Sequence, residues 1–454
     1  MNFHGVRMRI KKNYIVCLIV CIYSIIPYYF NIFGMSATNI ISLILIGLFL
    51  ITIDKGKLFI NKCILFYMFV ISCVCRSMSM AVNGSLESLY YLLKILIPFI
   101  FFMGVINTKD KFLTMIKMLV YVSGILCIFG ILEELTKFNI FSLLNNSGVT
   151  LNYNDLRFGL MRIISFTGQT ITYGIYTTFC MCLCFYLLSV YGKIKKNKTL
   201  LYIIYILQWI NVLLTISRSS ILCCILSQII LLFFCGMKKA FKIFILILLV
   251  FISVLCIGYF FVPKIQIAVS SLWYMLLAVF DSKYTAYIMN SFGNDNLNAV
   301  GHRLSLYKWV FQSMKGKWIF GNGYGAELNY QFRGITNGWH WTAIKNSIEV
   351  ESLSLLFQYG IVGMIPQILL YLNMLFIGIL GKRKKLDFEL KLTFNKVIIT
   401  IMIIYLFYFL ANCMGSEEIF FYIILSLVIV YNYKLTILRE RNYKRRKNDK
   451  DSRR

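Results

Sequence analysis

Four arginines stand where strongly apolar stretches of the chain end, and each has the chemistry to bind an anion there. Arg157 and Arg162 precede one apolar stretch, Arg218 lies in a short polar break between two others, and Arg303 sits on the apolar side of a helical pattern. A guanidinium is always charged, and its planar fork holds two phosphate oxygens at once. We therefore predict that these arginines bind an anionic substrate. The structural alternatives are pairing with lipid phosphate for Arg157 and Arg162, a surface hairpin for Arg218, and a snorkelling side chain for Arg303.

Three further side chains are candidates to exchange a proton. Glu349 and Glu351 stand at the start of an apolar run, and His340 lies between two tryptophans. Two residues apart on a helix, the glutamates point about 200° from each other, so at most one faces a given cavity and the other can cap the helix N-terminus. The alternative for His340 is an aromatic cluster at a membrane interface.

A segment with glycine at alternate positions, Phe320-Gly321-Asn322-Gly323-Tyr324-Gly325, lies between these groups. Glycine permits left-handed backbone and the close approach of another group. Successive N–H groups in such a turn can cradle an anion. Gly321 and Gly323 are therefore candidate binding residues, with a simple tight connection as the alternative.

The elements that must position these residues are membrane-spanning helices. Hydrophobic residues make up 59% of the sequence and charged residues 14%, against roughly 25% charged residues in an ordinary soluble domain. Apolar runs long enough to cross a bilayer as helices recur along the chain, so we predict an all-α membrane protein with about twelve transmembrane helices. The predicted runs are 14–33, 37–53, 58–75, 86–106, 112–133, 169–191, 199–216, 219–236, 240–262, 348–380, 397–414 and 417–433.

The net charge of +29 follows the two sides of this topology. Most of the 47 Lys and Arg fall at the N-terminus, in alternate connecting segments and in a basic tail, 434–454, whereas acidic residues gather in the other segments. This positive-inside pattern predicts that both termini are cytoplasmic. It accounts for the basic charge without a nucleic-acid partner, and the tail would lie well against anionic inner-leaflet lipid.

The predicted topology makes residues 1–454 a single polytopic domain with two long outer segments, 134–168 and 263–347. The second lies between predicted helices nine and ten, and its stretches 267–280 and 302–318 predict helices lying in the membrane interface. The inner loops are short and contain no phosphate-gripping loop, which argues against an ATP-driven pump. The three histidines show no metal-ligand spacing with cysteine, so we predict no metal site.

Several motifs occur in a recognisable order. Arg162 precedes Ser165-Phe166-Thr167-Gly168-Gln169; Ser217-Arg218-Ser219 joins two apolar runs; and Arg303, Trp309 and the glycine segment are followed by Glu351-Ser352 and Tyr359-Gly360-Ile361-Val362-Gly363. In this order and in its helix count, orientation and late outer loop, the chain resembles the O-antigen polymerase and O-antigen ligase superfamily, the Wzy- and WaaL-type membrane glycosyltransferases.

The resemblance implies an enzyme of the cytoplasmic membrane that moves a glycan from undecaprenyl pyrophosphate at the outer face, with no nucleotide, cofactor or metal. Arg162, Arg218 and Arg303 would grip the pyrophosphate, where fixed positive charge stabilises the leaving group. Glu351, Glu349 or His340 would take the proton of the acceptor hydroxyl.

The resemblance favours the polymerase branch. Where many members carry a His-Asn pair, this chain has Glu349 and Val350, which is closer to the Glu-Ser branch of polymerases. A polymerase uses a second lipid-linked repeat unit as acceptor and is expected to work with a flippase and a chain-length regulator. The alternatives are a ligase, which uses another acceptor, and a flippase for the same lipid-linked oligosaccharide.

Overall fold

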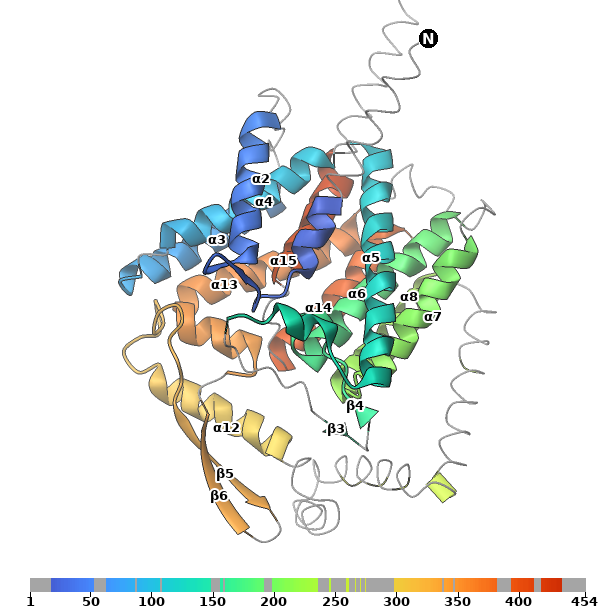
Figure 1. The fold of residues 1–454 in the computed structure, drawn as a ribbon. Coiled ribbons are helices and arrows are strands. Elements are labelled where there is room, and N and C mark those ends of the chain that lie inside the picture. Colours follow the sequence, from blue (N-terminus) through green and yellow to red (C-terminus); the bar gives the residue numbers. More distant parts are fainter. Residues whose placement is uncertain are drawn as a thin grey trace, which may run out of the picture.

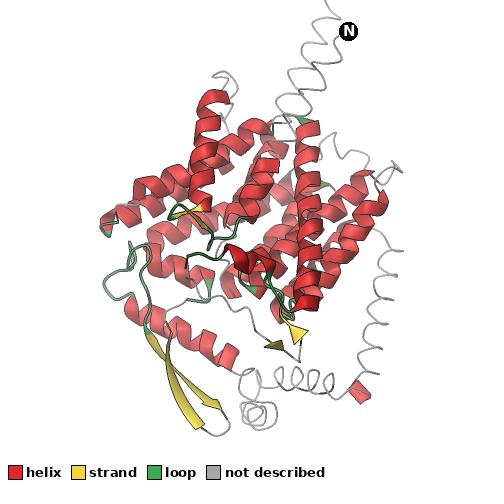
Figure 2. Cartoon of the chain, in the orientation of Figure 1, coloured by secondary structure: helices red, strands yellow, loops and turns green. Residues whose placement is uncertain are grey.

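A computed structural model of the protein describes residues 18–52, 63–85, 88–106, 108–147, 156–157, 160–191, 198–235, 298–336, 339–345, 348–381, 393–411 and 418–434, with a few residues between 245 and 274. Helices dominate (Figures 1 and 2). They are α2 (Ala37–Thr52), α3 (Ile64–Val82), α4 (Ser88–Val105), α5 (Lys109–Thr136), α6 (Thr170–Tyr191), α7 (Lys198–Leu214), α8 (Arg218–Cys235), α12 (Asn298–Ser313), α13 (Glu351–Leu380), α14 (Phe394–Ala411) and α15 (Glu418–Ile429).

Several of these helices are apolar and long enough to cross a membrane. Among the described residues, five meet both conditions: Ile64–Val82, Lys109–Thr136, Thr170–Val190, Arg218–Cys235 and Glu351–Leu380. Shorter apolar helices lie beside them, including Lys198–Leu214 and Phe394–Leu410. The prediction of a membrane protein built from apolar helices is confirmed. The count of twelve spans stays a prediction, and most of the predicted run 240–262 lies outside the described residues.

Two predicted runs have different bounds in the structure. In the first, 14–33, the described helix ends at residue 25, and a short hairpin of β1 (Asn31–Ile32) and β2 (Met35–Ser36) follows. Pro27 explains the break, because proline donates no N–H and disfavours helix in the residue before it. The third run, predicted to end at 75, continues as α3 to Val82 and so carries Arg76 into the helix bundle.

The second long outer segment contains both a helix and strands. Helix α12 replaces the predicted 302–318, and the predicted helix 267–280 lies almost wholly outside the described residues. Strands β5 (Tyr330–Thr336) and β6 (Trp339–Lys345) pair antiparallel and, with α12, stand beyond the helix bundle (Figure 1). The all-α prediction therefore missed a hairpin. Its sequence signals are alternating apolar residues and an Asn-Gly pair at 337–338.

One face of α12 packs against α13. Leu306, Val310 and Met314 are buried, and they pack in one cluster with Leu353 and Phe357 of α13. Phe311 of α12 and Trp318, which follows the helix, are 44% and 39% exposed, and their ring centres lie 5.8 Å apart. Helix α12 therefore rests on α13 through one face, and Phe311 lies on another.

Helix α13 packs against α3 and α14. At one end of the bundle, the Lys396 ammonium donates to the carbonyl of Phe234, which brings the start of α14 to the end of α8. At the opposite end, the Tyr307 hydroxyl donates to the carbonyl of Leu410, which brings α12 to the end of α14. Segments assigned to the same side of the membrane therefore lie together.

Candidate functional site

The glycine segment 320–325 docks against a break in α13. Gly360 has φ +66° and ψ −167°, a conformation that essentially only glycine adopts. The break leaves carbonyl groups of the preceding turn without helical partners. The N–H of Asn322 donates to the carbonyl of Phe357 at 2.7 Å, and the N–H of Gly323 donates to the carbonyl of Gln358 at 3.0 Å.

Backbone N–H groups of α13 that follow the break also find hydrogen-bond acceptors, in the residues just before the glycine segment. The N–H of Ile361 donates to the carbonyl of Trp318 at 2.9 Å, and the N–H of Val362 donates to the carbonyl of Ile319 at 3.1 Å. The segment and the broken helix thus complete each other's backbone hydrogen bonds, which fixes the segment at the end of the bundle.

Helix α3 and the residue that follows it also bind the docked segment. The hydroxyl of Ser79 donates to the carbonyl of Phe320 at 2.5 Å, and the amide of Asn83 donates to the same oxygen at 3.0 Å. A Cβ on Gly323 would lie 3.2 Å from the Cβ of Asn83. The segment is therefore held between α3 and α13.

The predicted left-handed backbone and close approach at the glycines are confirmed, with φ +73° at Gly321 and +104° at Gly323. The N–H of Gly321 donates to the carbonyl of Lys317, and that of Gly323 donates to α13. Since both N–H groups already donate to carbonyls, donating to a phosphate would require each of them to give up its present hydrogen bond. In this conformation the two glycines hold a turn in place.

Arg76 is a functional candidate that the sequence analysis missed. It lies in α3 and is only 2% exposed. Its Nη1 donates to the hydroxyl of Tyr91 in α4 at 3.0 Å, and its guanidinium carbon lies 5.7 Å from the ring centre of Tyr359 in α13. A charge buried this deeply is costly and is kept where it has a specific task. The sequence signal was a lone arginine at the edge of an apolar run, where it resembles a loop residue.

Glu351 belongs to the same region. It is the first residue of α13 and is half-buried. Its carboxylate and the Arg76 guanidinium both interact electrostatically with the hydroxyl of Tyr371. Glu351 and Arg76 therefore share Tyr371 as a neighbour.

Glu349 lies elsewhere, before α13 begins. Burial, together with the neighbouring carboxylate of Glu349, raises the pKa of Tyr330 in β5. The two glutamates thus have different neighbours, Tyr371 for Glu351 and Tyr330 for Glu349. The predicted helical spacing does not apply to them, because Glu349 precedes the first residue of α13.

Arg162 and Arg218 come together at the turn between α7 and α8. Arg162 is 8% exposed; its Nε donates to the carbonyl of Thr215 at 3.2 Å, and its Nη2 donates to the hydroxyl of Thr170 at 2.7 Å. Arg218 opens α8 and is exposed. The turn, with φ +48° at Ile216, places Arg218 three residues after the Thr215 carbonyl to which Arg162 donates.

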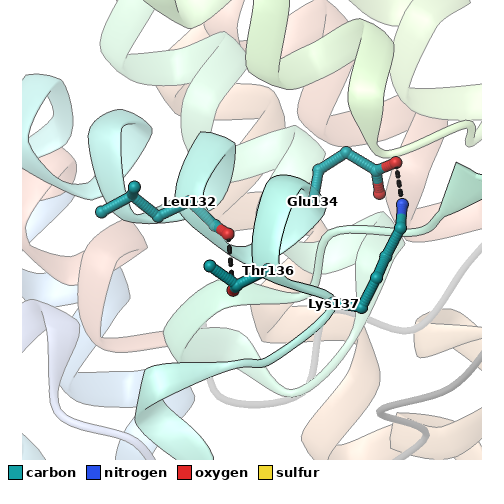
Figure 3. Close-up of polar contacts among 4 residues, drawn as sticks. All are labelled: Leu132, Glu134, Thr136 and Lys137. Atoms are coloured by element: carbon teal, nitrogen blue, oxygen red, sulfur yellow. Dashed lines mark hydrogen bonds and ion pairs between the residues drawn. The ribbon is translucent and has the colours of Figure 1, made fainter.

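A buried carboxylate positions the segment that carries Arg162. Glu133, 3% exposed in the last turn of α5, accepts hydrogen bonds of 3.0 Å from the N–H groups of both Ile164 and Ser165. The adjacent Glu134 instead pairs with Lys137 (Figure 3). The sequence analysis placed Glu133 only at the end of an apolar run, because hydropathy does not show which of two neighbouring glutamates faces inward.

The remaining predicted residues have described backbones only. Arg157 lies in β3 (Leu156–Arg157), which pairs with β4 (Leu160–Met161). Arg303 lies in α12, and His340 lies in β6 opposite Ile335. The side chains of these three residues lie outside the described part of the structure. Within the described residues, no group of three His, Cys, Asp or Glu is arranged to hold a metal ion.

Helix α14 connects the arginine pair to the α13 break. Its Tyr408 hydroxyl donates to the hydroxyl of Ser220, one turn into α8, and its Leu410 carbonyl accepts from Tyr307 of α12. The end of α14 therefore contacts both the first turn of α8, which begins at Arg218, and helix α12.

The fold and site define a helical membrane protein with basic and acidic groups gathered at one end of its bundle. Residues 203–368 match the family described as O-antigen ligase. The matched residues include Arg218, the glycine segment and Glu351, whereas Arg76, Glu133 and Arg162 precede them. No curated protein matches the chain.

Proposed function

We propose that the protein is a surface-polysaccharide polymerase of the cytoplasmic membrane. It transfers a growing glycan from undecaprenyl pyrophosphate to a lipid-linked repeat unit at the outer face. The observation that carries the proposal is the turn between α7 and α8, where Arg162 donates to the carbonyl of Thr215 and Arg218 follows three residues later. A pyrophosphate has the charge and the oxygen atoms to accept from both guanidinium groups.

The reaction needs one bond made and one broken. The acceptor hydroxyl oxygen attacks the anomeric carbon of the donor sugar, and the bond from that carbon to the pyrophosphate oxygen breaks. Charge grows on the leaving oxygen, where Arg162 and Arg218 stabilise it, with Arg303 and Arg157 as further candidates. The hydroxyl proton passes to a base, for which Glu351 is preferred and Glu349 and His340 are the other candidates.

The proposal needs no metal or nucleotide, because the arginines supply the positive charge at the leaving group. The donor and the acceptor of the reaction are both undecaprenyl-pyrophosphate-linked oligosaccharides, and the lipid bilayer holds both substrates at the site. A flippase would deliver these substrates, and a chain-length regulator would limit the product.

A ligase is the second candidate, because the matched family carries that description. The two enzymes differ in acceptor: a polymerase uses a second repeat unit, and a ligase uses a lipid or wall polymer. A deletion strain separates them. Loss of a polymerase leaves single repeat units at the cell surface, whereas loss of a ligase leaves long polymer on the lipid carrier.

The same strain tests the proposal against transport. Lipid-linked units trapped on the cytoplasmic side would show a flippase and contradict both enzyme candidates. Surface glycan resolved on a gel, with the carrier-linked fraction extracted in parallel, distinguishes the three results.

A further inference from the structure

Three tyrosines from separate segments converge above Arg76. Tyr91 of α4, Tyr324 of the glycine segment and Tyr359 of α13 form a triangle of rings with centroid separations of 6.3, 6.4 and 6.4 Å. We call these the tyrosine triad. Tyr359 is buried, Tyr91 is half-buried and Tyr324 is 47% exposed. The triad therefore runs from the bundle interior to an open aromatic ring at its end.

The exposed ring is rigidly presented. Tyr324 lies between Gly323 and Gly325, which both have positive φ and carry no side chain to cover the ring. The segment itself is fixed to α13 and α3 by the backbone and side-chain hydrogen bonds described above. A fixed aromatic ring without flanking side chains is a preorganised surface for a flat apolar partner.

Polar groups surround this ring, which argues against a lipid chain as its partner. Asn83, which is exposed, lies against Gly323, and Arg76 fixes the hydroxyl of Tyr91 beneath. A pyranose ring matches this mixture, since it offers a C–H face to the aromatic ring and hydroxyl groups to the polar rim.

We propose that Tyr324 and Tyr91 form a carbohydrate subsite that holds the acceptor sugar, a proposal that rests on the proposed function for the identity of the ligand. Arg76 is a positioning residue beneath the subsite, because it orients Tyr91 and contacts the face of Tyr359. The acceptor sugar then stacks on Tyr324, and the donor pyrophosphate binds at Arg162 and Arg218.

The test uses the free repeat-unit oligosaccharide, released from its carrier by mild acid, with the full-length protein in lipid nanodiscs. Without a pyrophosphate, this probe does not engage the arginine pair. Saturation-transfer NMR, with irradiation of aromatic protons, reports contact between those rings and sugar C–H groups. We expect transfer to the oligosaccharide with wild type and with Tyr324→Phe, and an about tenfold loss with Tyr324→Leu, which keeps apolar bulk without a π face.

The matched control is Tyr28→Leu, a change of another exposed tyrosine, 39% exposed and outside the triad; it should leave the transfer unchanged. Equal transfer with wild type and Tyr324→Leu overturns the inference, as does a wild type that makes polymer in cells but shows no transfer. Transfer that depends on Tyr324 in a protein that makes no polymer supports the subsite and contradicts the proposed function instead.

Discussion

Gly321 and Gly360 meet with no room for a side chain on either residue. A Cβ on Gly321 would lie 2.6 Å from the backbone N of Gly360, and a Cβ on Gly360 would lie 2.5 Å from the backbone N of Gly321. The contact joins the outer segment that carries Tyr324 to the helix that begins at Glu351. The position of the glycine segment, and of Tyr324 within it, relative to α13 depends on that junction.

Gly360→Ala should therefore undock the glycine segment. The new Cβ meets the carbonyl oxygen of Ile319 at 2.3 Å, and the backbone conformation is closed to alanine, so we expect a loss above about 3 kcal/mol and no polymer. The control is Gly325→Ala, which also has positive φ but has open space at its Cβ; it should cost about 1 kcal/mol. Thermal unfolding in detergent measures both, and equal losses would refute the docking role.

The two adjacent glutamates of α5 should differ in their effect on stability. Glu133→Gln replaces an acceptor oxygen with a donor opposite two backbone N–H groups, which should cost about 1–3 kcal/mol and disturb Arg162. Glu134→Gln removes only the pair with Lys137, for which we expect at most about 1 kcal/mol. Unfolding midpoints of the two purified variants decide the question, and identical midpoints would mean that Glu133 does not anchor the segment.

Glu351→Gln should stop transfer while the protein remains folded. Loss of a general base typically lowers the rate by about 10²–10⁴-fold. Glu349→Gln, which alters the neighbour of Tyr330, should retain most activity. Glycan ladders at matched protein levels compare the two variants with His340→Ala. Normal ladders from Glu351→Gln, with loss in either of the others, would move the base to that residue.

Polymer synthesis should depend on the planar shape of the Arg218 guanidinium as well as on its charge. Arg218→Ala removes a donor to the leaving group and should lower polymer synthesis by about 10²-fold or more. Arg218→Lys keeps the charge but loses the planar fork, so partial activity is expected. Lys315→Ala, at an exposed lysine after α12, serves as control. Unchanged ladders from both Arg218 variants would remove this residue from the pyrophosphate site.

The sequence predicts the class of fold well because apolar runs and charge by side are local properties. The positions of α5, α6, α8 and α13 follow from them. Arg162 and Arg218 were also singled out by the sequence, because arginines in short polar breaks are conspicuous in so apolar a chain; their role as anion ligands stays a prediction.

Tertiary partners account for what the sequence did not predict. Arg76 reads as a loop residue, since its burial depends on Tyr91 and Tyr359 from two distant helices. The sequence of the glycine segment is typical of an anion cradle. In the structure, the break in α13 supplies carbonyl groups that accept from the N–H groups of Asn322 and Gly323.

Reconstitution of the purified protein in vesicles with lipid-linked repeat units as the sole added substrate tests the central claim most directly. The vesicles receive EDTA and no nucleotide, and the glycan is resolved by length. We expect wild type to release undecaprenyl pyrophosphate and form a ladder of polymers, and Arg162→Ala and Arg218→Ala to form none. A wild type that leaves every repeat unit as a monomer, or equal ladders from wild type and both variants, would contradict the account.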